Sequence, residues 1–172
     1  MILDKIKEMG DNLRMLEGHD RLHYLIDKAK DLEPLPEALK TDDNRIRGCA
    51  SKLWLIGGVK DDGTMMYQVD GDAHISKGTA KLVTDIVNGE HRSAVANLTV
   101  ESFTPLGIKE LLTMQRQNGL GELIDRIIII KVLRPDDLMI LIIKSSQSAS
   151  KRLSGLIISV IRTANFSLTT IT

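Results

Sequence analysis

The chain has 172 residues, 42% of them hydrophobic and 27% charged, a composition that fits one globular domain with a real core. Its 23 basic and 23 acidic side chains balance to zero net charge, which argues against a general nucleic-acid or anionic-membrane binder. One cysteine cannot form an internal disulfide, an iron–sulfur cluster or a Cys-rich zinc site. No apolar run approaches the ~18 residues of a membrane span, and the start lacks a signal-peptide pattern, so we expect a cytoplasmic protein.

Two amphipathic helices are predicted at the start of the chain. Apolar residues recur at helical spacing over residues 2–16, and Gly18 ends this helix. Asp20 is expected to cap a second helix with its apolar face over 22–32, which stops before Pro34.

A β-hairpin is predicted next. Apolar runs at 53–59 and 65–69 flank a Lys-Asp-Asp-Gly segment at 60–63, whose Asp-Gly pair is typical of a hairpin turn. Two strands alone rarely make a stable sheet, so a third strand could precede or follow this pair.

The next elements are predicted to be helical again. Asp70 or Asp72 is expected to cap a helix whose apolar face runs over 75–87, and Asn88-Gly89 closes it. Ser93 is expected to cap a short helix that ends near Leu98.

A turn and two further helices complete the predicted fold. The turn covers 103–108, and a short helix follows over 108–112. Thr113 is expected to cap a helix with its apolar face over 120–127. Residues 131–172 are basic and rich in Ile and Ser, and their apolar runs at 138–143 and 156–161 look more like strands than helices.

Cys49 is the candidate reactive group, and it lies among cations. Arg45, Arg47 and Lys52 stand within four residues of it. The thiolate is the sulfur nucleophile, and nearby positive charge favours the thiolate. Gly48 lets the backbone take a positive φ or come close to a partner. The alternative, a buried small hydrophobe, stays open, although buried structural cysteines seldom lie beside three cations.

Two further features have plainer interpretations. Trp54 is expected to anchor the core, with docking of a partner as the alternative. His19 and His23 stand at i, i+4, but no third ligand is evident, so no metal site is predicted.

Residues 44–55 resemble the signature of the SufE family of cysteine-desulfuration proteins. They read Asn-Arg-Ile-Arg-Gly-Cys-Ala-Ser-Lys-Leu-Trp-Leu. Four more stretches agree with family elements in the same order, at 35–40, 70–78, 106–108 and 116–120. The resemblance covers residues 1–130, with Ala50 where relatives often carry Gln or Glu.

The resemblance implies an α+β fold, in which helices flank a small antiparallel sheet as in the IscU scaffold. It implies a sulfur-acceptor domain at 1–130 and leaves 131–172 as a C-terminal extension of unknown role. The helix–hairpin–helix order predicted from periodicity is compatible with this fold.

The resemblance also implies a function as a sulfur carrier rather than an enzyme. Cys49 would take persulfide sulfur from a cysteine desulfurase of the SufS or CsdA type, stimulate that enzyme, and pass the sulfur to a SufBCD-like iron–sulfur scaffold complex. Arg116 matches the family's late arginine and would position the loop or the partner, while Arg45, Arg47, Gly48 and Lys52 would support the sulfur. Pyridoxal phosphate belongs to the desulfurase, so no cofactor is expected here.

Other functions and assemblies stay open on the residues alone. No nucleic-acid or membrane partner is expected, and a homodimer is left open. One alternative is a cysteine-dependent hydrolase or peroxidase, although no histidine lies near Cys49 in the sequence. Another is a non-catalytic interaction domain in which the cysteine is incidental.

Overall fold

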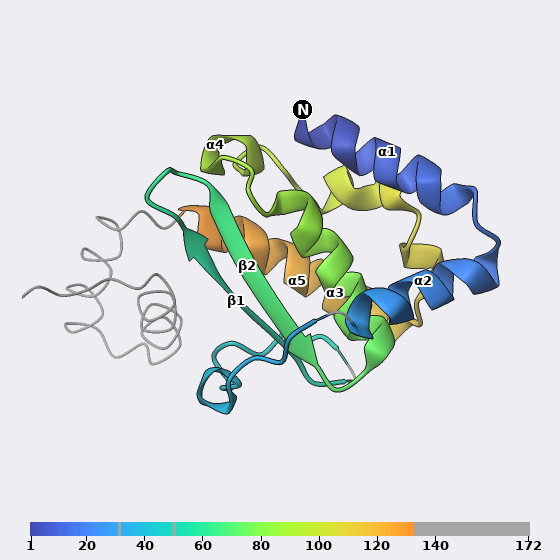
Figure 1. The fold of residues 1–172 in the computed structure, drawn as a ribbon, viewed down its shortest axis with the longest axis horizontal. Coiled ribbons are helices and arrows are strands. Elements are labelled where there is room, and N and C mark those ends of the chain that lie inside the picture. Colours follow the sequence, from blue (N-terminus) through green and yellow to red (C-terminus); the bar gives the residue numbers. More distant parts are fainter. Residues whose placement is uncertain (31, 50, 133–172) are drawn as a thin grey trace, which may run out of the picture.

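The fold is α+β, with helices packed on a two-stranded antiparallel sheet (Figure 1). The computed structural model describes residues 1–30, 32–49 and 51–132. The expected strand-like runs at 138–143 and 156–161 therefore lie outside the described residues, as does most of the proposed extension.

The predicted hairpin is confirmed. Strand β1 covers Leu53–Val59 and strand β2 covers Met65–Gly71, and they pair with Leu53 opposite Gly71 and Val59 opposite Met65. Gly63 takes a φ of +80° in the turn, a conformation that glycine adopts without a steric penalty. The described residues contain these two strands alone, so the third strand that could flank the pair is absent from them.

Alternation along the strands decides which face of the hairpin enters the core. The inner side chains come from both strands and are buried: Leu53, Leu55, Met65, Tyr67 and Val69. Trp54 lies between two of them on the opposite face and is half-buried, with Lys40 Nζ 5.9 Å from its ring centroid. The expectation that Trp54 anchors the core is therefore wrong, because its strand position points it away from the helices.

Helices α3 (His74–Val87) and α5 (Met114–Val132) cover the inner face of the hairpin. Helix α3 packs on β2, α5 packs on β1, and the two helices contact each other. Their apolar faces supply much of the core, including Leu82, Ile86, Leu123, Ile124 and Ile127. This layer brings two helices that are distant in sequence to the end of the hairpin where β1 begins.

Helices α1, α2 and α4 lie around α3 and α5, whereas η1 lies beyond the end of the hairpin (Figure 1). Helix α2 packs on α3, and α1 packs on η2. Their bounds are α1 (Ile2–Arg14), α2 (Gly18–Lys30), η1 (Glu37–Leu39), α4 (Arg92–Val95), η2 (Val100–Leu106) and η3 (Lys109–Leu111).

Three expected helix caps are wrong. Helix α2 begins at Gly18, ahead of Asp20. The N-cap of α3 is Ala73, because Asp70 pairs with lysines and Asp72 accepts a hydrogen bond from the Lys52 N–H. His91 replaces Ser93 as the cap of α4, and its ring nitrogen accepts from the Ser93 N–H.

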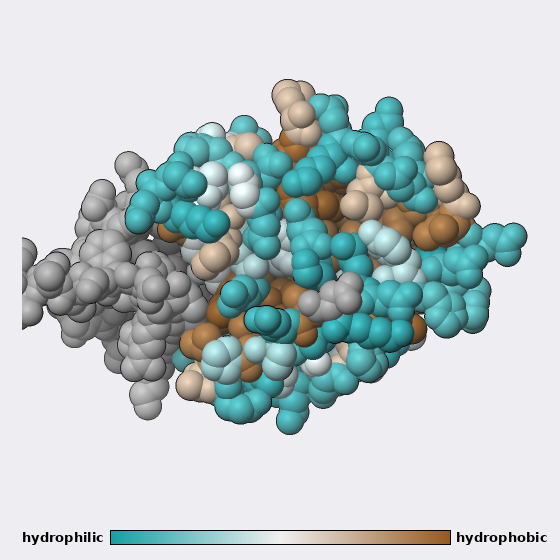
Figure 2. All heavy atoms as spheres, in the orientation of Figure 1, coloured by the Kyte–Doolittle hydropathy of each residue, from teal (hydrophilic) through white to brown (hydrophobic). Residues whose placement is uncertain are grey.

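Hydrophilic residues cover most of the face seen in Figure 2. The exposed large hydrophobic residues lie in or directly beside α1 and α5: Met1, Leu3, Met15, Met114 and Ile129. None of the helices in the described residues combines the length and apolar character that a bilayer-spanning helix needs.

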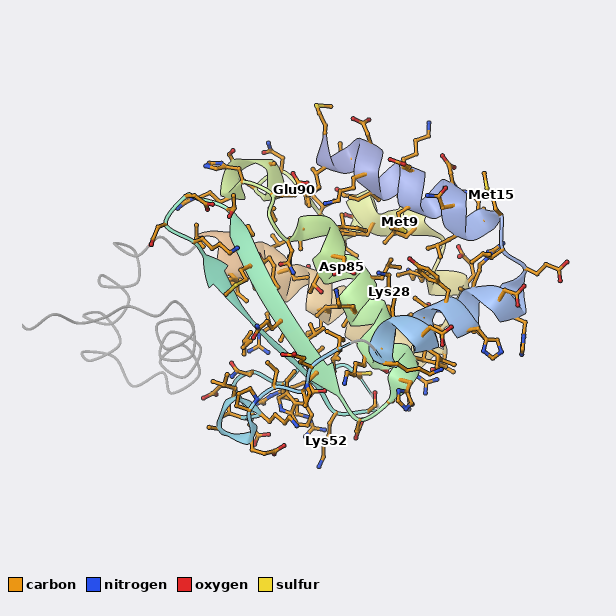
Figure 3. All side chains as sticks on the ribbon, viewed as in Figure 1. Met9, Met15, Lys28, Lys52, Asp85 and Glu90 are labelled. Carbon is orange, nitrogen blue, oxygen red and sulfur yellow. The ribbon has the colours of Figure 1, made fainter. Side chains whose placement is uncertain are left out.

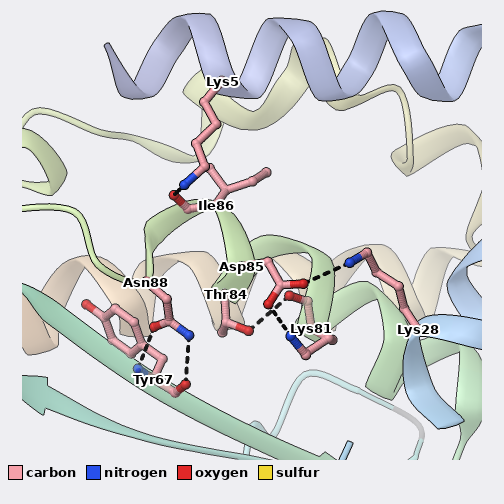
Figure 4. A network of polar contacts seen from close by, with 8 residues as sticks. All are labelled: Lys5, Lys28, Tyr67, Lys81, Thr84, Asp85, Ile86 and Asn88. Carbon is pink, nitrogen blue, oxygen red and sulfur yellow. Dashed lines mark hydrogen bonds and ion pairs between the residues drawn. The ribbon is translucent and has the colours of Figure 1, made fainter. Parts of the chain in front are cut away.

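Polar contacts fasten α1 and α2 to α3. Lys28 on α2 reaches Asp85 on α3, with 2.8 Å between Nζ and Oδ2 (Figures 3 and 4). Burial alone would raise the pKa of Asp85, but hydrogen bonds from Lys28 and Lys81 outweigh it and lower that pKa. Lys5 on α1 donates to the Ile86 carbonyl at 3.1 Å (Figure 4).

Candidate functional site

Cys49 lies at the end of the loop that joins η1 to β1. Its side chain is 8% exposed, and its sulfur borders a cavity of about 10 Å³, which has room for roughly one water-sized atom. The loop, the start of β1, α3, α5 and the residue that follows η3 contribute to its walls. The other lining residues are mostly apolar: Leu53, Ser76, Thr79, Ala80, Leu112, Arg116, Gly119, Leu120 and Leu123.

Two serine hydroxyls contact the sulfur. The Cys49 Sγ lies 3.2 Å from Ser51 Oγ and 3.5 Å from Ser76 Oγ. The Ser51 hydroxyl donates to Ser76 Oγ at 2.8 Å, so the three atoms form one hydrogen-bonded group. Sequence reasoning treated Ser51 only as a small neighbour and missed Ser76, which α3 brings to the sulfur from 27 residues away.

Helix α5 backs the cysteine through a glycine. A methyl group added at Gly119 would lie 2.7 Å from the Cβ of Cys49, closer than side chains pack. A methyl group at Gly48 would meet the Asn118 carbonyl oxygen at 3.1 Å. Gly48 is not among the described glycines with positive φ. Its lack of a side chain instead allows the loop to approach α5 closely at Asn118.

Glu122 on α5 holds the backbone just before the cysteine. One carboxylate oxygen accepts from the Arg47 N–H at 2.8 Å, and the other accepts from the Gly48 N–H. Both donors are consecutive backbone groups, so a single side chain fixes the orientation of the loop beside Cys49. Hydrogen bonds to a carboxylate are stronger than those between neutral groups.

Arg126, one helical turn after Glu122, binds backbone carbonyl groups of the same loop. Its guanidinium donates to the Arg45 carbonyl at 2.7 Å and to the Asp43 carbonyl. Burial lowers the pKa of Arg126, and the nearby Glu122 and Asp43 carboxylates oppose that shift. Glu122 and Arg126 together form what we call the loop clamp.

Of the four cationic residues predicted to support Cys49, one lines its cavity and three lie elsewhere. Among the described residues, Arg116 is the one charged side chain that lines the Cys49 cavity. Arg45 and Arg47 line a separate hollow of about 380 Å³ together with Asp42. The Lys52 side chain is exposed and points away from the body of the protein (Figure 3).

The site can therefore shelter a sulfur atom and donate hydrogen bonds to it. Its walls combine apolar side chains with Ser76, Thr79 and Arg116, and Ser51 contacts the sulfur from the loop. No histidine or carboxylate is among the described residues that line the cavity, so these walls offer a sulfur nucleophile no side-chain general base.

A family model described as a Fe-S metabolism associated domain, SufE, matches residues 7–129. The chain belongs to the SufE family. The matched segment contains the Cys49 loop, the hairpin, α3 and nearly all of α5, so every residue of the site described above belongs to the SufE domain.

Curated proteins that are similar to this SufE-family chain are themselves named SufE-like. An uncharacterized SufE-like protein of Rhizobium meliloti is 35% identical over 115 residues, which cover 64% of this chain and 82% of that protein. An uncharacterized SufE-like protein of Rhizobium etli is 35% identical over 129 residues, covering 73% and 86%. An Arabidopsis thaliana SufE-like protein 1, chloroplastic/mitochondrial, is 30% identical over 104 residues, covering 60% and 28%.

A solved structure has the same fold. The solution structure of a hypothetical protein from Thermus thermophilus aligns with a TM-score of 0.64 at 20% identity, covering 78% of this chain and 96% of that one. The expected α+β architecture is thereby confirmed.

Proposed function

We propose that this SufE-family protein accepts sulfane sulfur on Cys49 and carries it between two proteins. Family membership supports a role in iron–sulfur metabolism. The observation that carries the finer proposal is the Cys49 sulfur, buried beside a cavity of about 10 Å³ that Arg116 also lines, with two serine hydroxyls in contact with it. A cavity of that size matches one added atom at the sulfur.

The proposed reaction is an exchange between a thiolate and a persulfide. The Cys49 thiolate attacks the outer sulfur of a persulfide on the desulfurase cysteine. A new S–S bond forms at Cys49, the donor's S–S bond breaks, and the electron pair stays on the donor cysteine as its thiolate. The exchange is neutral in electrons, and the proton of the Cys49 thiol leaves to solvent beforehand.

Sulfur transfer requires the loop to leave its closed position, because Cys49 is 8% exposed. Release would break the loop clamp and separate Gly48 from Asn118, with Gly48 as the hinge. The closed position would then shelter a persulfide from other thiols between the two transfers.

The partners follow from the same chemistry. A pyridoxal-phosphate cysteine desulfurase would donate the sulfur and turn over faster once Cys49 removes it, and an iron–sulfur scaffold complex would receive it. Arg116, in the cavity wall, would orient the sulfur. Arg47 and Lys52 are exposed and Arg45 is half-buried, and all three would face a partner outside that wall. We place this exchange in the cytoplasm, with the protein acting as an accessory carrier.

The hydrolase alternative has less support. A cysteine hydrolase needs a base aligned with its thiol, and the described residues that line the cavity include neither histidine nor carboxylate. The hydrogen-bonding partners of the sulfur are hydroxyls, which suit an anion held in place.

Intact mass measurement tests the proposal directly. The protein is incubated with a cysteine desulfurase, pyridoxal phosphate and cysteine, and its mass is then measured. We expect the added mass of one sulfur atom, its loss on reduction, and no addition in Cys49→Ser. An unchanged wild-type mass, with the desulfurase active, would contradict the proposal.

A further inference from the structure

Ser76 carries a buried hydroxyl whose hydrogen bonds go neither to the backbone of a neighbouring element nor to the loop clamp. It is 5% exposed, it lies in the first turn of α3, and its partners are the Cys49 sulfur and the Ser51 hydroxyl. A polar side chain is kept in an apolar pocket only where its hydrogen bonds are made. Those bonds here lead to the sulfur.

We propose that Ser76, relayed by Ser51, is the hydrogen-bond donor that stabilises the anionic sulfur of Cys49 in the closed loop. The proposal rests on the sulfur-carrier function and assigns a residue to it. The anion is the Cys49 thiolate before loading and the persulfide anion afterwards.

The proton inventory supports this assignment. A serine hydroxyl has one proton to donate and two lone pairs to accept with. Ser51 donates its proton to Ser76 Oγ, which leaves the Ser76 proton for the sulfur at 3.5 Å. When Cys49 is a thiol, its S–H donates to Ser51 Oγ at 3.2 Å instead. The pair therefore satisfies both states of the sulfur by rotating hydroxyl groups.

The setting makes this donor important. The cavity has room for about one water, and Leu53, Leu112 and Leu123 line it, so bulk solvent cannot solvate an anion there. Ser76 is fixed on a helix, whereas Ser51 lies two residues from Cys49 and moves with it. The helix-bound donor therefore acts only in the closed loop, where it holds a loaded sulfur in the cavity.

The test substitution, Ser76→Ala, leaves every charged group near the sulfur in place. Arg116 lines the cavity from α5, and Glu122 binds the adjacent backbone. Lys77 and His74 lie in the first turn of α3, where Lys77 pairs with Asp70. The loop and its flank carry Arg45, Arg47, Lys52 and Asp72. Ser76→Ala changes none of these, so a shift in the titration reports the hydroxyl.

The experiment titrates the ultraviolet absorbance of the Cys49 thiolate, with Cys49→Ser as the blank. We expect Ser76→Ala to raise the midpoint pH by about one unit, because the anion loses a donor, and Ser76→Thr to restore it. Thr79→Val is the matched control: Thr79 lines the same cavity, but its hydroxyl donates to the Ile75 carbonyl at 2.7 Å. Its midpoint should match wild type.

Two results would overturn the proposal. One is an unchanged midpoint in Ser76→Ala, and the other is an equal rise in Thr79→Val, which would point to cavity polarity in general. Should Ser76→Ala fail to fold, Ser76→Gly removes the same hydroxyl, and an unchanged midpoint in that variant would overturn the proposal.

Sulfur retention separates this proposal from the carrier function. Protein loaded by a desulfurase should lose its sulfur to a small thiol several-fold faster in Ser76→Ala than in wild type, and equal loss rates would contradict the assignment. Failure of the wild type to load would contradict the carrier function alone, because the thiolate titration needs no desulfurase.

Discussion

Removing the Glu122 carboxylate should loosen the Cys49 loop without unfolding the protein. Glu122→Ala deletes the acceptor of two consecutive backbone N–H groups, while the two Arg126 hydrogen bonds to the loop carbonyls remain. A hydrogen bond to a charged group contributes about 1.5–3 kcal/mol. Because Glu122 is only half-buried and solvent replaces part of that energy, we expect loop opening to become easier by about 2 kcal/mol in total.

Amide hydrogen exchange measures the easier loop opening directly at the Arg47 and Gly48 N–H groups. An energy of about 2 kcal/mol corresponds to about 30-fold in an equilibrium constant, so the Arg47 and Gly48 amides should exchange about 30-fold faster in Glu122→Ala. Cys49 should react with a thiol reagent faster by a similar factor, because reaction also requires the open loop. Asp125→Ala, an exposed acid on the same helix, is the control and should change neither rate.

Unchanged amide exchange would show that Glu122 does not restrain the Cys49 loop. If the two amides exchange at the same rate in Glu122→Ala and wild type, Glu122 does not hold the loop. Faster exchange throughout α5 would instead indicate general destabilisation of the helix.

Three further variants test other parts of the structure. Gly119→Ala should push the loop off α5 and speed Cys49 modification about 10-fold or more, whereas Gly121→Ala, with open space around it, should change the rate little. Burial would raise the pKa of Asp70, but hydrogen bonds from Lys77 and Lys40 lower it, so its carboxylate stabilises the fold above about pH 4 and less as pH falls through the folded pKa. Asp70→Asn should therefore lose about 2–4 kcal/mol in urea unfolding at pH 7, and the loss should shrink as the pH is lowered below about 4; a loss that does not change with pH would contradict this. Tyr67→Phe should lose about 1 kcal/mol, because the Ile127 carbonyl loses a donor at 2.9 Å, and unchanged thermal stability would count against that bond.

Periodicity alone predicted most of the fold. The alternation in β1 and β2, the Asp-Gly turn, and the apolar stripes of α1, α3 and α5 are local signals, and the elements that they predict are present. The predictions of helix caps failed because an Asp near the start of a helix can instead bind groups from other parts of the fold. Asp70 is taken by Lys40 and Lys77, and proximity in sequence to a helix start cannot reveal that choice.

The site was predictable only where its residues are neighbours in sequence. Cys49 and Gly48 were found from the local motif, and Arg116 came from the family resemblance. Glu122 and Ser76 were missed because they reach the loop from 74 and 27 residues away. A signal for the clamp did exist: Gly119, Glu122 and Arg126 recur at spacings of three and four, so they share one side of a helix whose other side is apolar.

The clamp has a consequence for the order of events during synthesis. Helix α5 is the last described element to leave the ribosome, and the Cys49 loop depends on it for Glu122, Arg126 and the close approach at Gly119. A nascent chain would therefore present its cysteine before the helix that shelters it exists. Oxidation and stray thiol reactions should threaten the unfinished polypeptide more than the mature one.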